Sequence, residues 1–198
     1  MFRSPATTRI AVVGDVPVLL DLLAAERDLG GRAERAVNPA GSGDVAEALT
    51  ALITGEDSQV VLACVEDEPA GLVVMRLIRP DPLSDARLVQ LAHLVVAAGH
   101  RHRGVGHALV ESGAAFAAEH HAEHVSVSVF PSLRDASRFF ARLGFAPAAI
   151  FRVAPLGLLR KRLCADRGAA PLADGQRRRT RMLRPVPLAA RPRDEQKV

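Results

Sequence analysis

The chain has 198 residues, of which 48% are hydrophobic and 24% charged, and this balance is typical of a folded domain rather than a disordered or fibrous chain. Two cysteines exclude a disulfide-dense scaffold, and the absence of an apolar run of 18 residues excludes a transmembrane helix. The formal net charge of +4 is unevenly distributed, because residues 160–198 hold twelve Arg or Lys against four Asp or Glu. The positive excess therefore belongs to the C-terminal end.

The hydrophobic pattern predicts strands and helices that alternate along the chain. The expected strands cover residues 8–13, 59–65, 70–78, 87–96, 125–130, 148–153 and 156–163. The expected helices begin near Asp15, Asp44, Gly106 and Ser132, and they end near Gly30, Gly55, Glu119 and Gly144. This order predicts an α/β (α+β) chain whose mixed sheet carries helices on both faces.

Short polar and helix-breaking residues define several of these boundaries. Asp15 and Asp44 are expected to cap the first two helices, and Ser132 is expected to cap the last one. Residues 66–69 join two β-rich runs and indicate a hairpin. Residues 32–43 show no periodicity and contain Pro and Gly, which predicts a loop.

Both ends of the chain differ from its middle. The first residues, MFRSPATTR, lack the apolar core of a secretion signal. The two cysteines, for their part, show no disulfide or metal-ligand spacing. We therefore expect a cytoplasmic protein. Residues 1–8 are expected to form a short lead, and residues 165–198, rich in Arg and Pro without aromatic residues, are expected to be disordered.

One stretch joins an apolar strand to a helix through a turn of basic residues and glycines. The strand ends at Val96, after which Arg101 and Arg103 lead into Gly104 and Gly106. Glycine permits positive φ and close approach of a ligand, and a helix N-terminus presents unpaired N–H groups and the positive end of its dipole. This turn is therefore expected to bind an anion, most naturally a phosphate.

Residues 101–106, RHRGVG, resemble the R/Q-x-x-G-x-G/A signature of the GNAT superfamily of N-acetyltransferases. Residues 136–145, ASRFFARLGF, resemble the later A-x-x-x-Y-x-x-x-G-F segment of the same superfamily. The resemblance spans roughly residues 9–164, which we take as the acetyltransferase domain. It implies the GNAT fold, a central, mostly antiparallel mixed sheet of about seven strands with helices on both faces.

The resemblance also implies the co-substrate, acetyl-CoA, and the groups that hold it. The implied binding residues lie on the strand, on the turn and on a later helix: Leu94, Val95, Val96, Arg101, His102, Arg103, Gly104, Val105, Gly106, His107, Ala108 and Phe140. In this interpretation the backbone of the strand faces the acetyl and pantetheine amides, and the amides of the turn hold the pyrophosphate. The implied reaction is direct acetyl transfer to an amine within a ternary complex.

The chain departs from the family at the proton donor. Many relatives use a tyrosine at the position of Phe140, whereas this chain contains no tyrosine. Leu133 stands where the family often has an asparagine. A phenylalanine can still pack against pantetheine, so cofactor binding is expected to survive while the usual general acid is absent.

His93 is the titratable side chain within the strand, and the unperturbed pKa of a histidine, about 6.5, suits proton abstraction near neutrality. Strict alternation places Gln90, Ala92, Leu94 and Val96 on one face and His93 on the other. His93 is therefore either the catalytic base or a buried structural histidine, and a bulge near it would reverse its face.

The histidines His120, His121 and His124 include an i,i+4 pair. They end a helix, where protonated histidine interacts favourably with the dipole, so we expect no metal site there.

These observations leave three hypotheses of different kinds. The first is an acetyl-CoA-dependent N-acetyltransferase acting on a primary amine of a small molecule or peptide. The second, motivated by the missing tyrosine, is an acetyl-CoA-binding regulatory or sensor module with little turnover. The third, nucleic-acid binding through the Arg-rich tail, is not favoured, because no aromatic residues interleave the arginines. We expect no membrane partner, and exposed sheet edges would allow a homodimer.

Overall fold

The computed structural model describes residues 6–27, 44–81, 83–130, 132–150 and 152–168. The chain divides into two compact units, Met1–Ile150 and Phe151–Val198, which are described separately. The loop expected at residues 32–43 and the tail after residue 168 lie outside the described residues.

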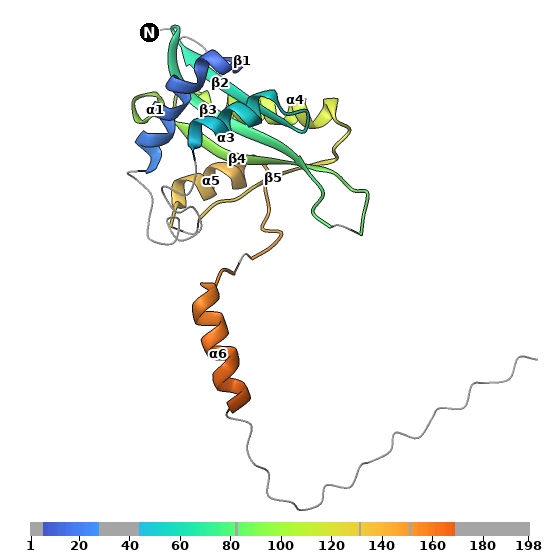
Figure 1. Ribbon diagram of the computed structural model, residues 1–198. Helices are drawn as coiled ribbons and strands as arrows, with labels where there is room; N and C mark the ends of the chain where they lie inside the picture. Colours follow the sequence, from blue (N-terminus) through green and yellow to red (C-terminus); the bar gives the residue numbers. More distant parts are fainter. Residues whose placement is uncertain (1–5, 28–43, 82, 131, 151, 169–198) are drawn as a thin grey trace, which may run out of the picture. The chain divides into compact units, whose positions relative to one another are not determined.

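A single sheet organises the described residues of the first unit (Figure 1). Its strands lie in the order β1-β2-β3-β4-β5. They are β1 (Thr7–Ile10), β2 (Ser58–Val65), β3 (Glu68–Ile78), β4 (Leu88–Val96) and β5 (His124–Val127). The first four strands pair antiparallel, and β5 pairs with β4 in parallel, which confirms the mixed, mostly antiparallel sheet.

Helices precede, connect and follow these strands. In the first unit they are the 3₁₀ turn η1 (Val13–Asp15), α1 (Val16–Arg27), α3 (Val45–Thr54), the 3₁₀ turn η2 (Ala98–His100), α4 (Val105–Glu119) and α5 (Arg134–Arg142). The second unit contains α6 (Leu156–Gly168). None of the helices in the described part of the chain combines the length and apolar character needed to cross a bilayer.

Two local signals in the sequence are confirmed. The side chain of Asp44 accepts a hydrogen bond from the N–H of Ala46 at 2.9 Å and caps α3. Glu66 and Asp67 join β2 to β3 with φ of 53° and 66°. Two consecutive positive φ values are the geometry of a type I′ hairpin turn, whose twist matches that of the strands it joins.

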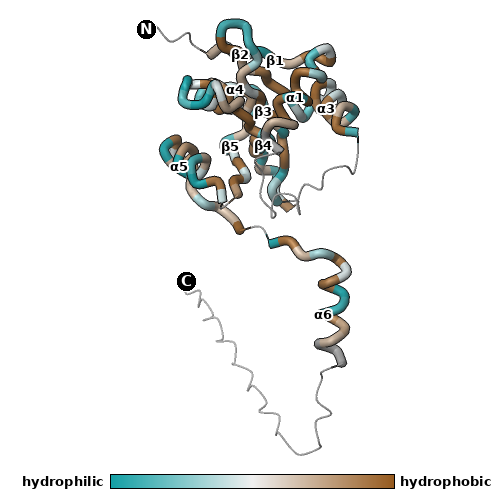
Figure 2. The backbone as a smooth tube through the Cα atoms, turned by 90° about the vertical axis from the view of Figure 1, so that its left-hand side faces the viewer, coloured by the Kyte–Doolittle hydropathy of each residue, from teal (hydrophilic) through white to brown (hydrophobic). Residues whose placement is uncertain are grey.

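The central strands consist largely of hydrophobic residues, drawn brown in Figure 2. Their side chains take part in two core clusters, one on each face of the sheet. One core cluster joins α4 to one face through residues such as Leu91, Val105 and Leu109. The other cluster joins α1 and α3 to the opposite face through residues such as Leu19 and Leu62. Because β2, β3 and β4 are covered on both sides, they read as nearly continuous apolar runs.

The prediction of strands at 148–153 and 156–163 is wrong for the described residues. Residues 145–150 and 152–155 are in neither strand nor helix, and Leu156 begins α6. Leu, Arg and Lys are good helix formers, and they dominate this segment. The described sheet therefore has five strands instead of about seven, and the expected domain end at residue 164 falls inside α6.

Two predicted helix caps are also corrected. Asp15 is the last residue of η1, where it accepts a hydrogen bond from the Val12 N–H at 2.8 Å instead of capping α1. Leu133 rather than Ser132 is the N-cap residue of α5, and no side chain caps that helix. The following Gly144 ends the α5 region with φ of 89°.

Candidate functional site

A β-bulge interrupts β4 at His93. Ala92 pairs with Val74 and Val95 pairs with Leu72, so two residues of β4, His93 and Leu94, lie opposite Val73 alone. His93 takes a left-handed conformation with φ of 48°. For a residue other than glycine this conformation is uncommon and costs free energy, so the surrounding sheet must hold it in place.

The bulge changes which side chains share a face. Ala92 packs with the α1 side of the core, whereas Leu94 packs with the α4 side. The predicted grouping of Ala92 with Leu94 on one face is therefore wrong, because the extra residue resets the alternation. His93 itself is exposed, so the interpretation as a buried structural histidine is also wrong.

β4 and β5 separate before β4 ends. Their pairing runs from Leu88 opposite His124 to Leu91 opposite Val127, while β4 continues to Val96. Just beyond the strand, the Ala97 N–H donates to the Ala70 carbonyl at 2.9 Å, on the β3 side. Backbone groups alternate in direction along a strand, so those of Val96 face the other side, where the two strands have parted.

The turn after β4 leads directly into α4. Gly104 is the N-cap residue, with φ of 86°, and no side chain caps the helix. The first helical hydrogen bond runs from the Ala108 N–H to the Gly104 carbonyl at 3.1 Å. The N–H groups of Val105, Gly106 and His107 precede this bond and have no acceptor within the helix. They form a cluster of donors at the positive end of the helix dipole.

Space in front of this helix end is open at Gly104. A Cβ atom placed on Gly104 would meet nothing within 4 Å. The side chain of Val105, by contrast, is 1% exposed and belongs to the core, so its contribution to a ligand would come from its backbone. Gly71 of β3 makes this packing possible, since a Cβ there would lie 3.1 Å from the Val105 Cγ1 atom.

Basic residues surround the turn. Arg101 and His102 are exposed, and Arg103 is half-buried. The Nε–H of Arg101 donates to the Val96 carbonyl at 3.5 Å, which draws the turn toward the parted edge of β4. His100 lies just before the turn, with its Nε2 atom 3.9 Å from the Glu68 carboxylate and its Nδ1 atom buried without a partner in the described residues.

Phe139 of α5 lies beside the turn, and sequence reasoning did not single it out. Its ring lies 3.3 Å from the position that a Cβ on Gly106 would occupy, and it meets the His107 ring edge-on at 5.1 Å. Phe140, the residue taken from the family motif, is only 6% exposed and packs between Phe139 and Phe145. Two consecutive phenylalanines in the sequence indicate that an aromatic ring of α5 packs against its surroundings. Which of the two rings faces the turn depends on the rotation of the helix, and the sequence does not give that rotation.

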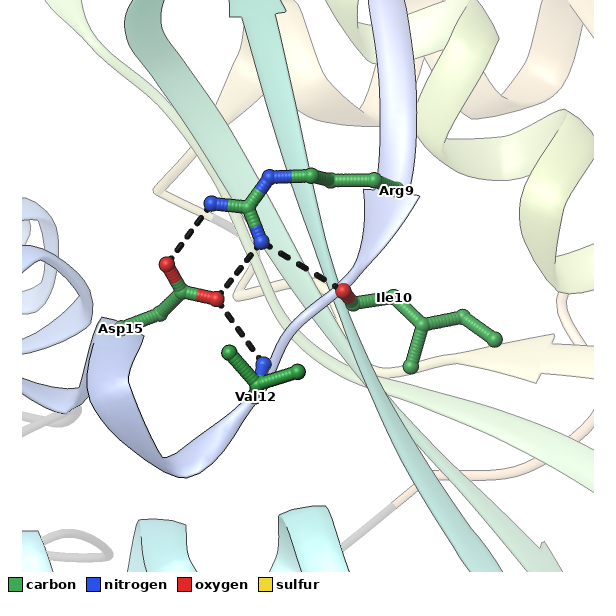
Figure 3. A network of polar contacts seen from close by, with 4 residues as sticks. All are labelled: Arg9, Ile10, Val12 and Asp15. Atoms are coloured by element: carbon green, nitrogen blue, oxygen red, sulfur yellow. Dashed lines mark hydrogen bonds and ion pairs between the residues drawn. The ribbon is translucent and has the colours of Figure 1, made fainter.

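A second polar feature joins β1 to η1 at the far edge of the sheet (Figure 3). The two terminal guanidinium nitrogens of Arg9, Nη1 and Nη2, donate to the Asp15 carboxylate at 2.6 and 2.7 Å, and the Val12 N–H donates to it as well. The hydrogen bonds from Arg9 and then from Val12 lower the pKa of Asp15 to about 2. Arg9 and Asp15 border a cavity of about 350 Å³ that Cys64 also lines.

At the end of α4, His120 contacts Phe116 of its own helix. Its Nδ1 atom lies 2.9 Å from the Phe116 carbonyl oxygen, and its ring packs against the Phe116 ring at an angle of 44°, with the two centroids 4.1 Å apart.

An uncapped helix N-terminus beside two parted parallel strands is an arrangement that suits a phosphorylated ligand. A sequence model of the acetyltransferase (GNAT) family matches residues 31–145, more than half of the chain. The chain belongs to this family and is an acetyltransferase by that membership. The match ends at Phe145, before α6 begins.

Solved structures show the same fold. A tetramutant of the BH1408 protein from Bacillus halodurans has a TM-score of 0.64 at 21% identity, over 76% of this chain and 99% of that one. The ribosomal-protein-alanine N-acetyltransferase from Brucella melitensis biovar Abortus 2308 has a TM-score of 0.60 at 19% identity, over 77% and 99%. The aminoglycoside acetyltransferase meta-AAC0020 from an uncultured soil sample has a TM-score of 0.59 at 17% identity, over 76% and 96%. No protein with a curated description matches the chain.

Proposed function

We propose that this chain is an acetyl-CoA-dependent N-acetyltransferase that moves an acetyl group directly to a primary amine. The observation that carries the proposal is the uncapped N-terminus of α4, open at Gly104 and adjacent to the parted end of β4. Backbone N–H groups in this arrangement suit a diphosphate, and a parted strand offers further N–H groups to the amides of a pantetheine chain.

The described residues fit acetyl-CoA in separate parts of the site. The N–H groups of Val105, Gly106 and His107 would hold the diphosphate, with positive charge from Arg101 and Arg103. The outward-facing backbone of Val96 would bind the pantetheine portion. When bound, acetyl-CoA supplies a thioester whose carbonyl carbon accepts a nucleophile.

His93 is the proposed general base. The β4 bulge leaves its side chain exposed on the strand that borders the parted edge. In the transfer, the amine nitrogen bonds to the acetyl carbon, the carbon–sulfur bond breaks, and coenzyme A leaves as thiolate. His93 would accept the proton that the amine loses. Because the chain contains no tyrosine, the thiolate must take its proton from another group or from water.

The acceptor is proposed as a primary amine of a small molecule or peptide. Two proteins of similar fold are named for acceptors of these kinds, an aminoglycoside acetyltransferase and a ribosomal-protein-alanine N-acetyltransferase. These two proteins support a broad class of amine acceptors. At 17% and 19% identity with this chain, they do not select one compound.

The test is steady-state release of free thiol from acetyl-CoA in the presence of a panel of aminoglycosides and peptide N-termini. Amine-dependent thiol release above the rate without amine is the expected result. The missing tyrosine specifically favours a second candidate, an acetyl-CoA-binding regulatory module. Tight binding of acetyl-CoA without turnover on any amine of the panel would favour that module over the enzyme.

A further inference from the structure

Basic residues lie on two elements that meet at the N-terminus of α4, the turn before it and α5. Arg101 and Arg103 precede the helix within the turn. On α5, Arg134, Arg138 and Arg142 recur every four residues, so they line one face of that helix, and all three are exposed.

Phe139 places α5 beside the turn. Its ring contacts the position above Gly106 and the ring of His107. Arg138 immediately precedes Phe139, and Arg142 follows it by one helical turn. Both arginines therefore flank the ring that anchors α5 to the start of α4, while Arg134 lies one turn farther along the helix.

The turn and α5 together carry more arginines than are needed to balance the charge of a diphosphate. Among the described residues, Arg138 pairs with Asp135 at 3.5 Å, and both side chains are largely exposed, so the pair is weak. No ion pair of the described residues neutralises Arg101, Arg103 or Arg142. The helix N-terminus and the two arginines of the turn already oppose the charge of a diphosphate, so the α5 arginines are left to bind another anion.

We propose that Arg138 and Arg142 bind the 3′-phosphate of coenzyme A and make the protein selective for the 3′-phosphorylated donor. This inference rests on the proposed function. Coenzyme A carries a phosphate monoester on the ribose, one nucleoside away from its diphosphate. An anion tethered so closely to the turn must lie near the elements that contact the turn, and α5 is one of them. Guanidinium groups suit such a monoester because their donors form a planar fork that pairs with phosphate oxygens.

The experiment compares the dissociation constants of coenzyme A and 3′-dephospho-coenzyme A by isothermal titration calorimetry. The wild-type chain is expected to prefer coenzyme A by roughly tenfold, the effect of two exposed charge pairs. In a double variant, Arg138→Gln with Arg142→Gln, the preference is expected to fall to about twofold or less, with affinity for the dephospho ligand unchanged.

Arg76→Gln is the matched control, because Arg76 is an exposed arginine of β3 that lies far from the start of α4. Gly71 of the same strand packs against Val105 of α4, and Arg76 is five residues, about 17 Å, farther along the strand. That variant should keep the wild-type preference, and Arg142→Lys should keep part of it. The ratio of two affinities within one protein is insensitive to a general loss of folded molecules.

Two results would overturn the inference: equal wild-type affinity for the two ligands, or an unchanged preference in the double variant. If the double variant kept that preference but lost affinity for RNA, the α5 face would be a nucleic-acid surface instead. Failure of the wild-type chain to bind either ligand would overturn the proposed function itself, which separates that failure from failure of the inference.

Discussion

Gly104 combines two properties at the start of α4, a φ of 86° and open space where a side chain would project. In Gly104→Val, the branched residue would have to adopt this left-handed conformation, which costs an L-residue about 1–2 kcal/mol. It would also occupy the approach to the N–H groups of Val105 and Gly106. We therefore expect a moderate loss of stability together with loss of acetyl-CoA binding, measured by urea denaturation and by calorimetry.

Gly99→Ala is the control for this change. A Cβ on Gly99 also meets nothing within 4 Å, but Gly99 has no positive φ and does not belong to α4. That variant should bind acetyl-CoA as the wild type does. Undiminished binding by Gly104→Val would show that the turn is not the diphosphate site.

His93 yields a prediction about the pH dependence of turnover. A base must be deprotonated to work, so kcat/KM should fall as the pH drops and imidazole becomes protonated. In His93→Ala, kcat/KM at neutral pH should fall by about 10²- to 10⁴-fold, and this acidic limb should disappear. The measurement is the pH–rate profile of thiol release.

His124→Ala is the comparison variant, since His124 is exposed at the start of β5 and away from the bulge. It should keep both the rate and the acidic limb. An acidic limb that persists in His93→Ala would remove His93 as the base.

At the scale of residues, the features that could not be predicted from the sequence are those set by backbone geometry. The glycines and arginines of the turn were readable because glycine and guanidinium have chemical meaning at a helix start. The bulge at His93 was not readable, because a strand with one extra residue has the same composition as a regular one. The contact of Phe139 with the turn was not readable either, because it depends on the rotation of α5, which tertiary packing sets.

At the level of elements, the Arg9–Asp15 pair fastens the edge strand β1 to η1 and makes a prediction about pH. The pKa of Asp15 is lowered to about 2 from an ordinary value of 3.8. A carboxyl whose pKa is lower in the folded state stabilises the fold in full above its unfolded pKa. This contribution is lost as the pH falls from about 4 through about 2.

Asp15→Asn should therefore destabilise the chain by about 1 kcal/mol at pH 7, a value reduced for solvent screening because the Arg9 side chain is 51% exposed. Near pH 2 the variant and the wild type should differ little in free energy of unfolding. Urea denaturation at both pH values is the measurement, with Glu56→Gln as an exposed control. An equal deficit at both pH values would show that the lost stability does not come from the ionised carboxylate.

Elements were predictable where local chemistry agrees with tertiary structure. The Asp44 cap and the hairpin at residues 66–67 depend on neighbouring residues only, and both are confirmed. The segment 156–163 was predicted as a strand, yet its Leu, Arg and Lys residues favour the helix that is observed. Local propensity was the better guide there, because no partner strand constrains the segment among the described residues.

For the whole molecule, the division of charge agrees with the division into units. Residues 1–150 carry thirteen Arg or Lys against eighteen Asp or Glu, so the basic excess of the chain lies in the second unit. The family match stops at Phe145, inside the first unit. The groups that this proposal assigns to acetyl-CoA thus lie in a unit of net negative charge, and they attract an anion through local amides and arginines rather than through overall charge.

Binding at one site should stabilise the whole fold. A ligand that binds only the folded state at a hundred times its dissociation constant adds about 2.7 kcal/mol, which for a chain of this length raises Tm by roughly 5–10 °C. Acetyl-CoA should produce this shift in a thermal melt followed by circular dichroism. Pantetheine at the same concentration lacks the diphosphate and should shift Tm far less, because the N–H groups of α4 would have no anion to bind. Since α4 packs against β2, β3 and β4, a ligand held at its first turn stabilises the sheet as a unit. An unchanged Tm at millimolar acetyl-CoA would contradict the assignment of the turn as the donor site.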